Sequence, residues 1–295
     1  MQFGKIERPE QVDFTLPQDH MDSLASLSAY PANKPLELHI GCAKWNRQEL
    51  KNFYPRGTRD ELGYYATQFN SIELNATFYR IFGPDQYRTW YEATPPEFRF
   101  FPKVVQHVSH LRRLNEKAYG VLDNFLEHTS GFGDKLGTIF LQLHPNFGPA
   151  NWERVRRFVE YWPRPMALAI EFRHPGWFRD EVLAAELYQL LEENAIGNIL
   201  VDTAGRRNLL HMRLTNDEAF IRFVGANHPM DYDRLDDWVQ RLKEWHGQGL
   251  RKIRFFIHQN VEECSPLLAS YFIEKLNKAL ETNLHIPLSQ KIRTF

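Results

Sequence analysis

Residues 137–173 read GTIFLQLHPNFGPANWERVRRFVEYWPRPMALAIEFR, and this stretch decides the fold. It holds two short apolar runs, at 137–143 and 167–173, and apolar residues recur at helical spacing over 151–161 between them. Two strands that are connected through a helix form a parallel pair. The stretch therefore predicts one strand–helix–strand unit of a parallel sheet.

Six more apolar runs of the same kind lie on either side of this unit. They are LELHIGC (36–42), SIELNATF (71–78), RFFPKVV (99–105), AIGNILVD (195–202), AFIRFVG (219–225) and KIRFFIHQ (252–259). Helical patterns also cover 58–69, 115–128, 179–193, 232–245 and 264–280. The first of these opens with a capping box, Thr58 to Glu61. Only the segment between the sixth and seventh predicted strands lacks a convincing helix.

Eight strands that start about 31 residues apart, with helices between them, predict a parallel eight-stranded (β/α)8 TIM barrel. An open doubly wound sheet is the structural alternative, but it usually carries a glycine-rich phosphate loop, and no such motif occurs in this chain. We expect the barrel domain over 36–285. An irregular, proline-interrupted N-terminal extension at 1–35 precedes it, and a C-terminal tail at 286–295 follows it.

The composition indicates a folded protein without a strong electrostatic field. Hydrophobic residues make up 43% and charged residues 25% of the 295 residues, which excludes a disordered chain. The 36 basic and 37 acidic residues leave a net charge of −1, so neither nucleic acid nor an acidic membrane is favoured as a partner. Neither a membrane-spanning run nor an N-terminal signal peptide is evident, and the chain has only two cysteines. We therefore expect a cytoplasmic protein with reduced thiols.

Polar residues interrupt the predicted strands near their C-terminal ends. They are Glu73 and Asn75, Lys103, Gln142 and His144, Glu171 and Arg173, Asp202, Arg222, and His258 and Asn260. Burying an ionised group is unfavourable by several kcal/mol unless the group is paired or solvated. The C-terminal ends of barrel strands meet at one mouth, so these residues predict a shared ligand site there. The alternative is that each forms a separate structural ion pair or caps a strand end.

The mixture of charges suits a small polar ligand that carries an anionic group or many hydroxyls. Glu73 and Glu171 are the candidate acid and base, and Lys103 is the third candidate catalytic residue. The candidate ligand-binding residues are Asn75, His110, Arg173, Asp202, Arg222, His258, Asn260, Trp45, Tyr79 and Trp177. The three aromatic residues follow predicted strands, where their rings can stack on a sugar or base; the alternative is that they bury the rim of the barrel.

A metal centre is the weaker alternative for the same ends of the strands. Glu171, Asp202 and His258 have suitable ligand atoms, but the chain has neither HExxH nor paired CxxC motifs. We therefore expect neither a metal nor a cofactor.

Several motifs of this chain also occur together in a known family. They are Ile40-Gly41 through Trp45, Phe53-Tyr54-Pro55, Ile72 to Asn75 with Thr77-Phe78-Tyr79, Trp90 with Thr94-Pro95, Phe98 to Lys103, Ser109-His110, Glu171-Phe172-Arg173 with Trp177, Asp202 and Arg222. Over residues 36–280 the chain resembles the YecE-like family, domain of unknown function family 72. The resemblance implies a TIM barrel and supplies no established reaction.

The chain departs from the family pattern at several of these motifs. Leu50 stands near the place of a second tryptophan, and Ser109-His110 replaces a usual Thr-His. The sequence Arg222-Phe-Val-Gly225 lacks a usual histidine, and residues 256–260 read FIHQN where the family has Phe-Asn-Asn. The pocket is therefore expected to differ from that of relatives along the seventh and eighth strands.

Three classes of function remain open from the sequence. The first is an enzyme of hydrolase or isomerase/lyase type that acts by acid/base chemistry on a small polar, anionic or carbohydrate-like molecule. The second is a barrel that processes or binds nucleic acid through loop aromatics and arginines. The third is a non-catalytic ligand sensor or scaffold, which would present an apolar patch or an oligomer interface at the mouth instead of an open pocket.

Overall fold

The computed structural model describes residues 5–30 and 34–288. Its strands are β1 (Glu37–Cys42), β2 (Ser71–Leu74), β3 (Arg99–Pro102), β4 (Ile139–Gln142), β5 (Leu168–Glu171), β6 (Gly197–Asn198), β7 (Leu200–Thr203), β8 (Glu218–Gly225) and β9 (Lys252–Gln259). All eight predicted runs therefore contain strand. The sixth run is divided at Ile199 into β6 and β7.

The described strands form two parallel sheets. One has six strands in the order β3-β2-β1-β9-β8-β7, and the other has three in the order β4-β5-β6. Isolated bridges from Phe100 to Leu136 and from Lys103 to Phe140 connect the two sheets on one side. These pairings define an α/β fold with a central six-stranded parallel sheet and a second parallel sheet of three strands.

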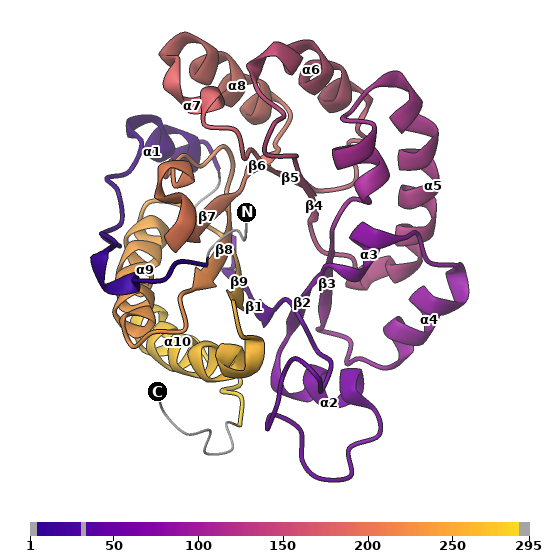
Figure 1. Cartoon of the computed structure of the whole chain (residues 1–295), viewed down its shortest axis with the longest axis vertical. Coiled ribbons are helices and arrows are strands. Elements are labelled where there is room, and N and C mark those ends of the chain that lie inside the picture. The colour runs from indigo at the N-terminus through magenta and orange to yellow at the C-terminus, as the bar shows by residue number, and fades with distance from the viewer. Residues whose placement is uncertain (1–4, 31–33, 289–295) are drawn as a thin grey trace.

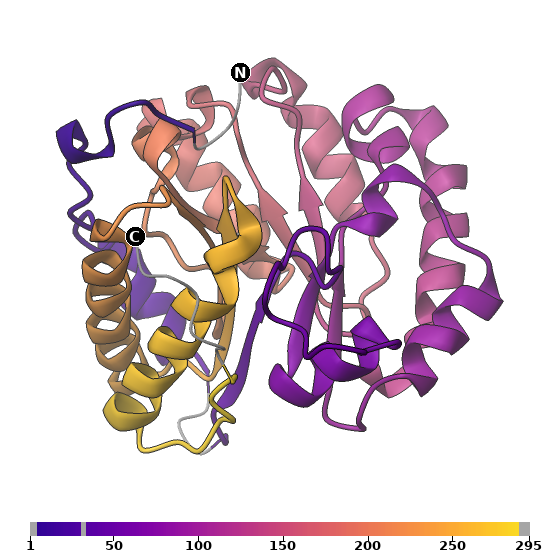
Figure 2. The ribbon, with the colours of Figure 1, turned by 60° about the horizontal axis from the view of Figure 1, so that its bottom comes forward.

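Helices cover the outside of the strands, which surround the middle of the molecule in Figure 1. They are α1 (Met21–Ser28), α2 (Glu61–Gln68), α3 (Ala76–Tyr79), α4 (Pro84–Glu92), α5 (Tyr119–Thr129), α6 (Trp152–Tyr161), α7 (Gly176–Arg179), α8 (Glu181–Glu193), α9 (Met230–Gly247) and α10 (Ser265–Leu280). The long helices α9 and α10 pack side by side, as Figure 2 shows from another direction.

Shorter helical turns occupy several of the connections. The 3₁₀ turns are η1 (Pro9–Gln11), η3 (Glu116–Ala118), η4 (Ser130–Lys135), η5 (Pro149–Asn151), η6 (Ala204–Leu209) and η7 (Glu262–Cys264), and η2 (His107–Leu111) is a π-helix. Only η6 lies between β7 and β8, so the predicted lack of a regular helix there is confirmed.

An apolar layer fills the space between the strands. It consists of Phe101, Phe140, Ala169, Ile199, Val201, Phe220 and Phe256, each at most 2% exposed. Side chains two residues apart on a strand share a face, so the residue that follows each member by two also points inward. This periodicity places polar side chains directly above the apolar layer.

Three local predictions need correction. The strand predicted at 71–78 ends at Leu74, because Asn75 adopts helical backbone angles and α3 follows at once. Asp60, not Thr58, caps α2, because its carboxylate accepts the N–H of Gly63 at 2.9 Å. The N-terminal extension is not irregular throughout: the proline-free residues 18–30 contain α1, whose Leu27 is fully buried.

The ends and cysteines of the chain can be compared with the predictions only in part. Residues 1–4, 31–33 and 289–295, in the predicted extension and tail, lie outside the described residues. Cys42 is buried and Cys264 is half-buried, and both are free thiols. Among the described residues, no helix combines the length and apolar character that crossing a membrane requires.

Candidate functional site

The C-terminal ends of the strands bring several predicted site residues into one buried cluster. We call Glu73, Lys103, Gln142, Glu171, Arg222 and His258 the strand-end cluster. Its members come from or directly follow β2, β3, β4, β5, β8 and β9. Lys103, Gln142, Glu171, Arg222 and His258 each lie two residues beyond a member of the apolar layer, which explains why all of them point inward.

Arg222 lies at the centre of the cluster and joins two carboxylates. Its Nε and Nη2 donate to the two oxygens of Glu73 at 2.9 and 2.8 Å, and its Nη1 donates to Glu171 Oε2 at 2.5 Å. A planar guanidinium can serve both carboxylates because its N–H groups diverge in one plane. Glu73 and Glu171 therefore share a single cation and are not two separate ion pairs.

Two further donors reach the same two oxygens of Glu73. His258 Nε2 donates to Glu73 Oε2 at 2.9 Å, and Asn75 Nδ2 donates to Oε1 at 2.8 Å. Each carboxylate oxygen of Glu73 thus accepts two hydrogen bonds.

Gln142 links Glu171 to Lys103. Its Nε2 donates to both oxygens of Glu171 at 2.9 and 3.0 Å, while its Oε1 accepts a hydrogen bond from Lys103 Nζ at 2.8 Å. Arg173 Nε lies 3.4 Å from Glu171 Oε1 and completes the surroundings of that carboxylate. The six strand ends are therefore connected through one continuous network.

The network keeps both glutamates ionised. Burial by itself raises the pKa of Glu73, but Arg222 and His258 outweigh burial and hold this pKa well below its usual range. Burial likewise raises the pKa of Glu171, and Arg222 and Arg173 more than offset it. Burial disfavours the charge of Arg222, yet the two carboxylates raise its pKa. The carboxylates therefore act as permanent counterions near neutral pH.

Lys103 has a different environment from the arginines. No carboxylate of the described residues lies within 4.0 Å of its Nζ, which is 4.3 Å from the centre of the Phe78 ring and 5.8 Å from that of Phe140. Burial and the nearby Arg222 lower the pKa of Lys103 to about 7. This amine therefore exists in both protonation states near neutral pH.

Two histidines lie beside Lys103. His110, in η2, packs edge-on against Phe78, and its ring centre is 5.3 Å from that of His144. Burial and the positive charge of Lys103 lower the pKa of His110 to about 4, and burial also lowers the pKa of His144. Both imidazoles are therefore neutral at pH 7. Isolated π-helical turns such as η2 are often found at functional sites.

Solvent reaches the cluster from the side of its donors. Glu73 and Glu171 are 0% and 1% exposed, whereas the side chains of Arg173 and His258 are 12% and 13% exposed. Lys103 is 7% exposed. An approaching molecule therefore meets N–H groups first and the carboxylates last.

Asp202 and Trp177 do not belong to this cluster, contrary to the sequence-based expectation. Asp202 follows the inward-pointing Val201, so it faces the helices, where it accepts hydrogen bonds from Arg234 and Trp238 at 2.8 Å. Trp177 is fully buried in the outer core and donates its indole N–H to the carbonyl of Phe147. Both residues hold helices or loops against the sheets.

Three other predicted ligand-binding residues lie away from the network. Trp45 is half-buried against Trp90, Tyr79 is 67% exposed, and Asn260 is exposed just beyond β9. Among the described residues, none of the three forms a hydrogen bond or ion pair with the strand-end cluster.

The structure gives roles to two residues that the sequence left without one. Gln142 connects Lys103 to Glu171, and Phe78 covers the amine of Lys103. Gln142 was among the polar residues that predict the shared site, and its position two residues after Phe140 marks it as inward-pointing. Phe78 could not be assigned in this way, because α3 interrupts the alternation of β2.

The alternative metal set of Glu171, Asp202 and His258 is not assembled. Asp202 points to α9, away from the side of the sheet on which Glu171 and His258 lie. More generally, the described part of the chain holds no group of three histidine, cysteine or acidic side chains arranged for a metal ion.

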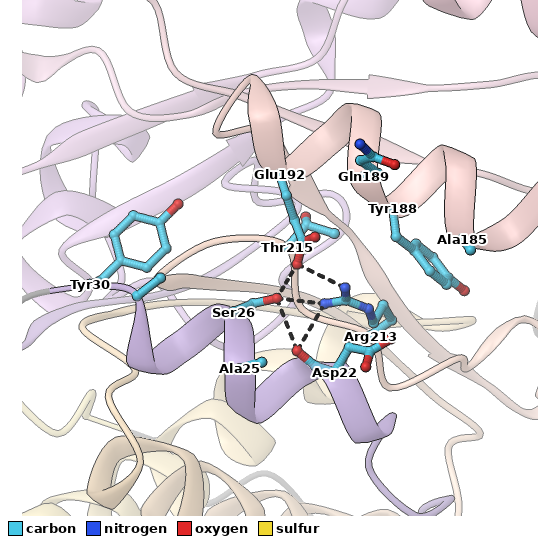
Figure 3. Close-up of a pocket in the computed structure, with 11 residues that line it drawn as sticks. Asp22, Ala25, Ser26, Tyr30, Ala185, Tyr188, Gln189, Glu192, Arg213 and Thr215 are labelled. Carbon is cyan, nitrogen blue, oxygen red and sulfur yellow. Dashed lines mark hydrogen bonds and ion pairs between the residues drawn. The ribbon is translucent and has the colours of Figure 1, made fainter.

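A pocket of about 500 Å³ lies outside the strands, between α1 and α8. Figure 3 shows Arg213 there, among Ser26 and Glu192. Arg213 donates to Ser26 Oγ at 2.7 Å and to Glu192 at 2.8 Å, so its guanidinium attaches α1 to α8. This arrangement gives the N-terminal helix a structural role.

The fold and cluster define a parallel α/β protein with a charged network at the C-terminal ends of its strands, and the comparisons identify its family. Residues 39–291 match the model of the family described as "Protein of unknown function DUF72". The chain belongs to this family, as its motifs suggested.

Curated relatives agree with this assignment. The UPF0759 protein YecE of Escherichia coli (strain K12) is 25% identical over 268 residues, which cover 82% of this chain and 94% of that protein. The UPF0759 protein YunF of Bacillus subtilis (strain 168) is 24% identical over 245 residues, which cover 77% and 80% of the two chains.

Solved structures show that the fold is shared. A DUF72 family protein from Enterococcus faecalis V583 has a TM-score of 0.68 at 17% identity and covers 85% of this chain and 100% of its own. A DUF72 family protein from Thermotoga maritima MSB8 has a TM-score of 0.65 at 23% identity, with coverage of 83% and 100%.

Proposed function

We propose that this protein binds a small polar ligand with an anionic group at the strand-end cluster, and that Lys103 transfers a proton to or from that ligand. One observation carries the proposal: the solvent side of the cluster presents the donors of Lys103, Arg173 and His258, while both carboxylates lie behind them. Such a face attracts an anion and repels a cation.

The two glutamates serve as counterions in this proposal and not as the acid and base. All four oxygens of Glu73 and Glu171 accept hydrogen bonds, and their pKa values are lowered, so neither carries a proton near pH 7. Lys103 is suited to proton transfer because its pKa of about 7 is close to neutral pH. A bound anion would raise the pKa of Lys103 and so strengthen its own binding.

The proposal includes one closed eight-stranded (β/α)8 barrel made from the two sheets. Two hydrogen bonds at the ends of β3 and β4 support closure on one side: Val104, after β3, donates its N–H to Phe140 O at 2.9 Å, and Gly137, before β4, donates its N–H to Phe100 O at 2.8 Å. On the other side, β6 and β7 are separated only by Ile199, whose N–H donates to Ile170 O at 2.9 Å. In a closed barrel these amides exchange with solvent as slowly as those between β8 and β9.

Calorimetry with matched pairs of compounds tests the function. We expect glucose 6-phosphate or 3-phosphoglycerate to bind, and glucose or glycerol not to bind. A variant Lys103→Met should weaken binding at least tenfold. Lys135→Met is the matched control, because Lys135 is also buried but donates to the carbonyls of Tyr91 and Thr94, before the N-terminal ends of β3 and β4 and not at the C-terminal ends where the cluster lies.

The result that would overturn the proposal is equally concrete. Equal affinity for the charged and neutral members of each pair would contradict the proposed anion site. So would affinities that Lys135→Met and Lys103→Met change to the same extent. A single-stranded oligonucleotide, tested in the same calorimetric experiment, distinguishes a nucleic-acid site from a small-molecule site. The affinity of a nucleic-acid site would fall steeply with salt concentration.

A further inference from the structure

The two most buried lysines of the described chain differ in the number of acceptors around the amine. Lys135 Nζ donates to Tyr91 O, Thr94 O and Thr94 Oγ1, at 2.6, 2.6 and 3.2 Å. Three acceptors match the three N–H bonds of an ammonium group. Within the part of the chain that the structure describes, Lys103 Nζ has a single hydrogen-bond acceptor, Gln142 Oε1. The surroundings of Lys103 are therefore built for an amine more than for an ammonium ion.

Three side chains surround the amine of Lys103. Phe78 and Phe140 cover two sides with aromatic carbon, and Gln142 fixes the position of Nζ from a third. Lys103 is 7% exposed, and the side chains of Arg173 and His258, in the same cluster, are 12% and 13% exposed. A ligand whose anionic group lies at Arg173 or His258 would bring its adjacent carbon atoms toward Lys103.

We propose that Lys103 is a nucleophile that forms an imine with an aldehyde or ketone carrying an anionic group. The inference rests on the proposed function, because it assigns the ligand class of the same site. A desolvated lysine next to other cations is a typical nucleophile for carbonyl compounds. The lowered pKa of Lys103 supplies the unprotonated amine that this chemistry needs. At pH 7 its free-amine fraction would exceed that of an ordinary lysine roughly a thousandfold.

The step balances without an added oxidant or reductant. The lone pair of Nζ attacks the carbonyl carbon, and a C–N bond forms as the C=O π bond breaks. Both hydrogens of the amine then leave with the carbonyl oxygen as one molecule of water, which gives a C=N bond. Protonation of the imine nitrogen gives an iminium ion, whose positive charge the nearby Glu171 network can stabilise.

Reductive trapping tests this inference on the full-length chain. The protein is incubated with pyruvate or dihydroxyacetone phosphate and cyanoborohydride, which adds hydride to an imine and makes the bond permanent. Lactate and glycerol 3-phosphate are the matched compounds without a carbonyl group. The two carbonyl probes distinguish a carboxylate from a phosphate as the anionic group. Peptide mass spectrometry of the wild-type chain then locates every modified lysine, so the assignment does not depend on the folding of a variant.

We expect one modified residue, Lys103, with at least one of the two carbonyl probes. Lys103→Met should lose the adduct, and Lys135→Met should retain it. Two outcomes overturn the inference: an adduct spread over many lysines, or no adduct at Lys103. If lactate or glycerol 3-phosphate still binds in a Lys103-dependent way while no adduct forms, the proposed function stands and only the imine falls.

Discussion

The two ends of the strand interior both place an arginine between two carboxylates. At the C-terminal ends, Arg222 joins Glu73 to Glu171. At the N-terminal ends, Arg254 donates to Glu218 at 3.1 Å and to Glu37 at 2.7 Å, beside a cavity of about 360 Å³. Because an arginine lies between two carboxylates at both ends, such a network by itself is not evidence of a binding site.

The difference lies in the cations next to each arginine. At the N-terminal ends, Lys252 lies 3.3 Å from Asp217, and His39 accepts a hydrogen bond from Arg254, while burial and Arg254 lower the pKa of His39 to about 2. The cationic and imidazole groups named at the N-terminal ends are therefore either paired with a carboxylate or neutral. At the C-terminal ends, the one hydrogen-bond acceptor of Lys103 within residues 5–30 and 34–288 is the neutral amide of Gln142. The comparison therefore supports our proposal that the chemistry lies at the C-terminal ends, whereas the paired groups at the N-terminal ends hold the strands together.

Removal of the two arginines should produce the largest contrast between the ends. Arg222→Met removes the cation that two buried carboxylates share, and we expect the free energy of unfolding to fall by about 3–5 kcal/mol. The free energy of unfolding should fall less in Arg254→Met, because Glu37 is half exposed and Glu218 still accepts a hydrogen bond from the hydroxyl of Thr138. Urea unfolding of both variants measures this. An equal or greater loss in Arg254→Met would contradict the contrast.

The pH dependence of stability sharpens the comparison at Lys103. Its pKa is about 7 in the folded state and about 10.4 in an unfolded chain, so between these values the unfolded state binds one more proton. Stability should therefore rise with pH across this interval, by at most about 1.4 kcal/mol per pH unit from this group. Unfolding measured from pH 6 to 10 should show that Lys103→Met lacks this rise.

The loss of stability at acidic pH should come from the two glutamates and not from Lys103. Glu73 and Glu171 have lowered pKa values in the folded state. Their contribution is therefore complete above the unfolded value of about 4.3 and is lost as pH falls through the folded values. A slope above pH 7 that Lys103→Met leaves unchanged would show that another group titrates there.

Replacement of Phe78 should give the smallest effect. Phe78→Leu keeps an apolar cover over Lys103 but removes the aromatic face that favours the ammonium form, an interaction of about 0.5–1 kcal/mol. We expect the pKa of Lys103 to fall below its wild-type value, as followed by NMR titration of its side chain. Phe82→Leu is the control, since Phe82 packs against Arg80 and Trp90 instead. A rise in the pKa of Lys103 would show that the ring does not favour the charge.

Much of the fold was predictable because its signals are local. Eight apolar runs, their helices and the missing helix before β8 follow from periodicity and turn residues. Helix α1 was missed because the prolines around it suggested irregular structure, although residues 18–30 contain none. The division of one run at Ile199 depends on which neighbours pair with it, and no local pattern encodes that choice.

The candidate site was predictable in its residue types and less so in its grouping. Period-two spacing after an apolar residue identifies Lys103 and Glu171 as inward-pointing. The same rule, applied to Val201, would have turned Asp202 toward the helices, where it contacts Arg234 and Trp238. Trp177 illustrates a different limit, because an aromatic residue after a strand can fill the outer core as readily as it can line a mouth.

The positions of the strands along the chain and the alternation of their faces were thus predictable from the sequence, because both depend on residues that are near neighbours in the chain. The partner of each buried charge was decided by the tertiary structure. Arg222 reaches Glu73 across 149 residues, and Lys103 reaches Gln142 across 39. Coulombic and hydrogen-bond energies depend on distances of a few ångströms in a medium of low polarity. Only the folded chain sets those distances, and so only the fold gave Lys103 a neutral acceptor, Gln142, where Arg222 has two carboxylates.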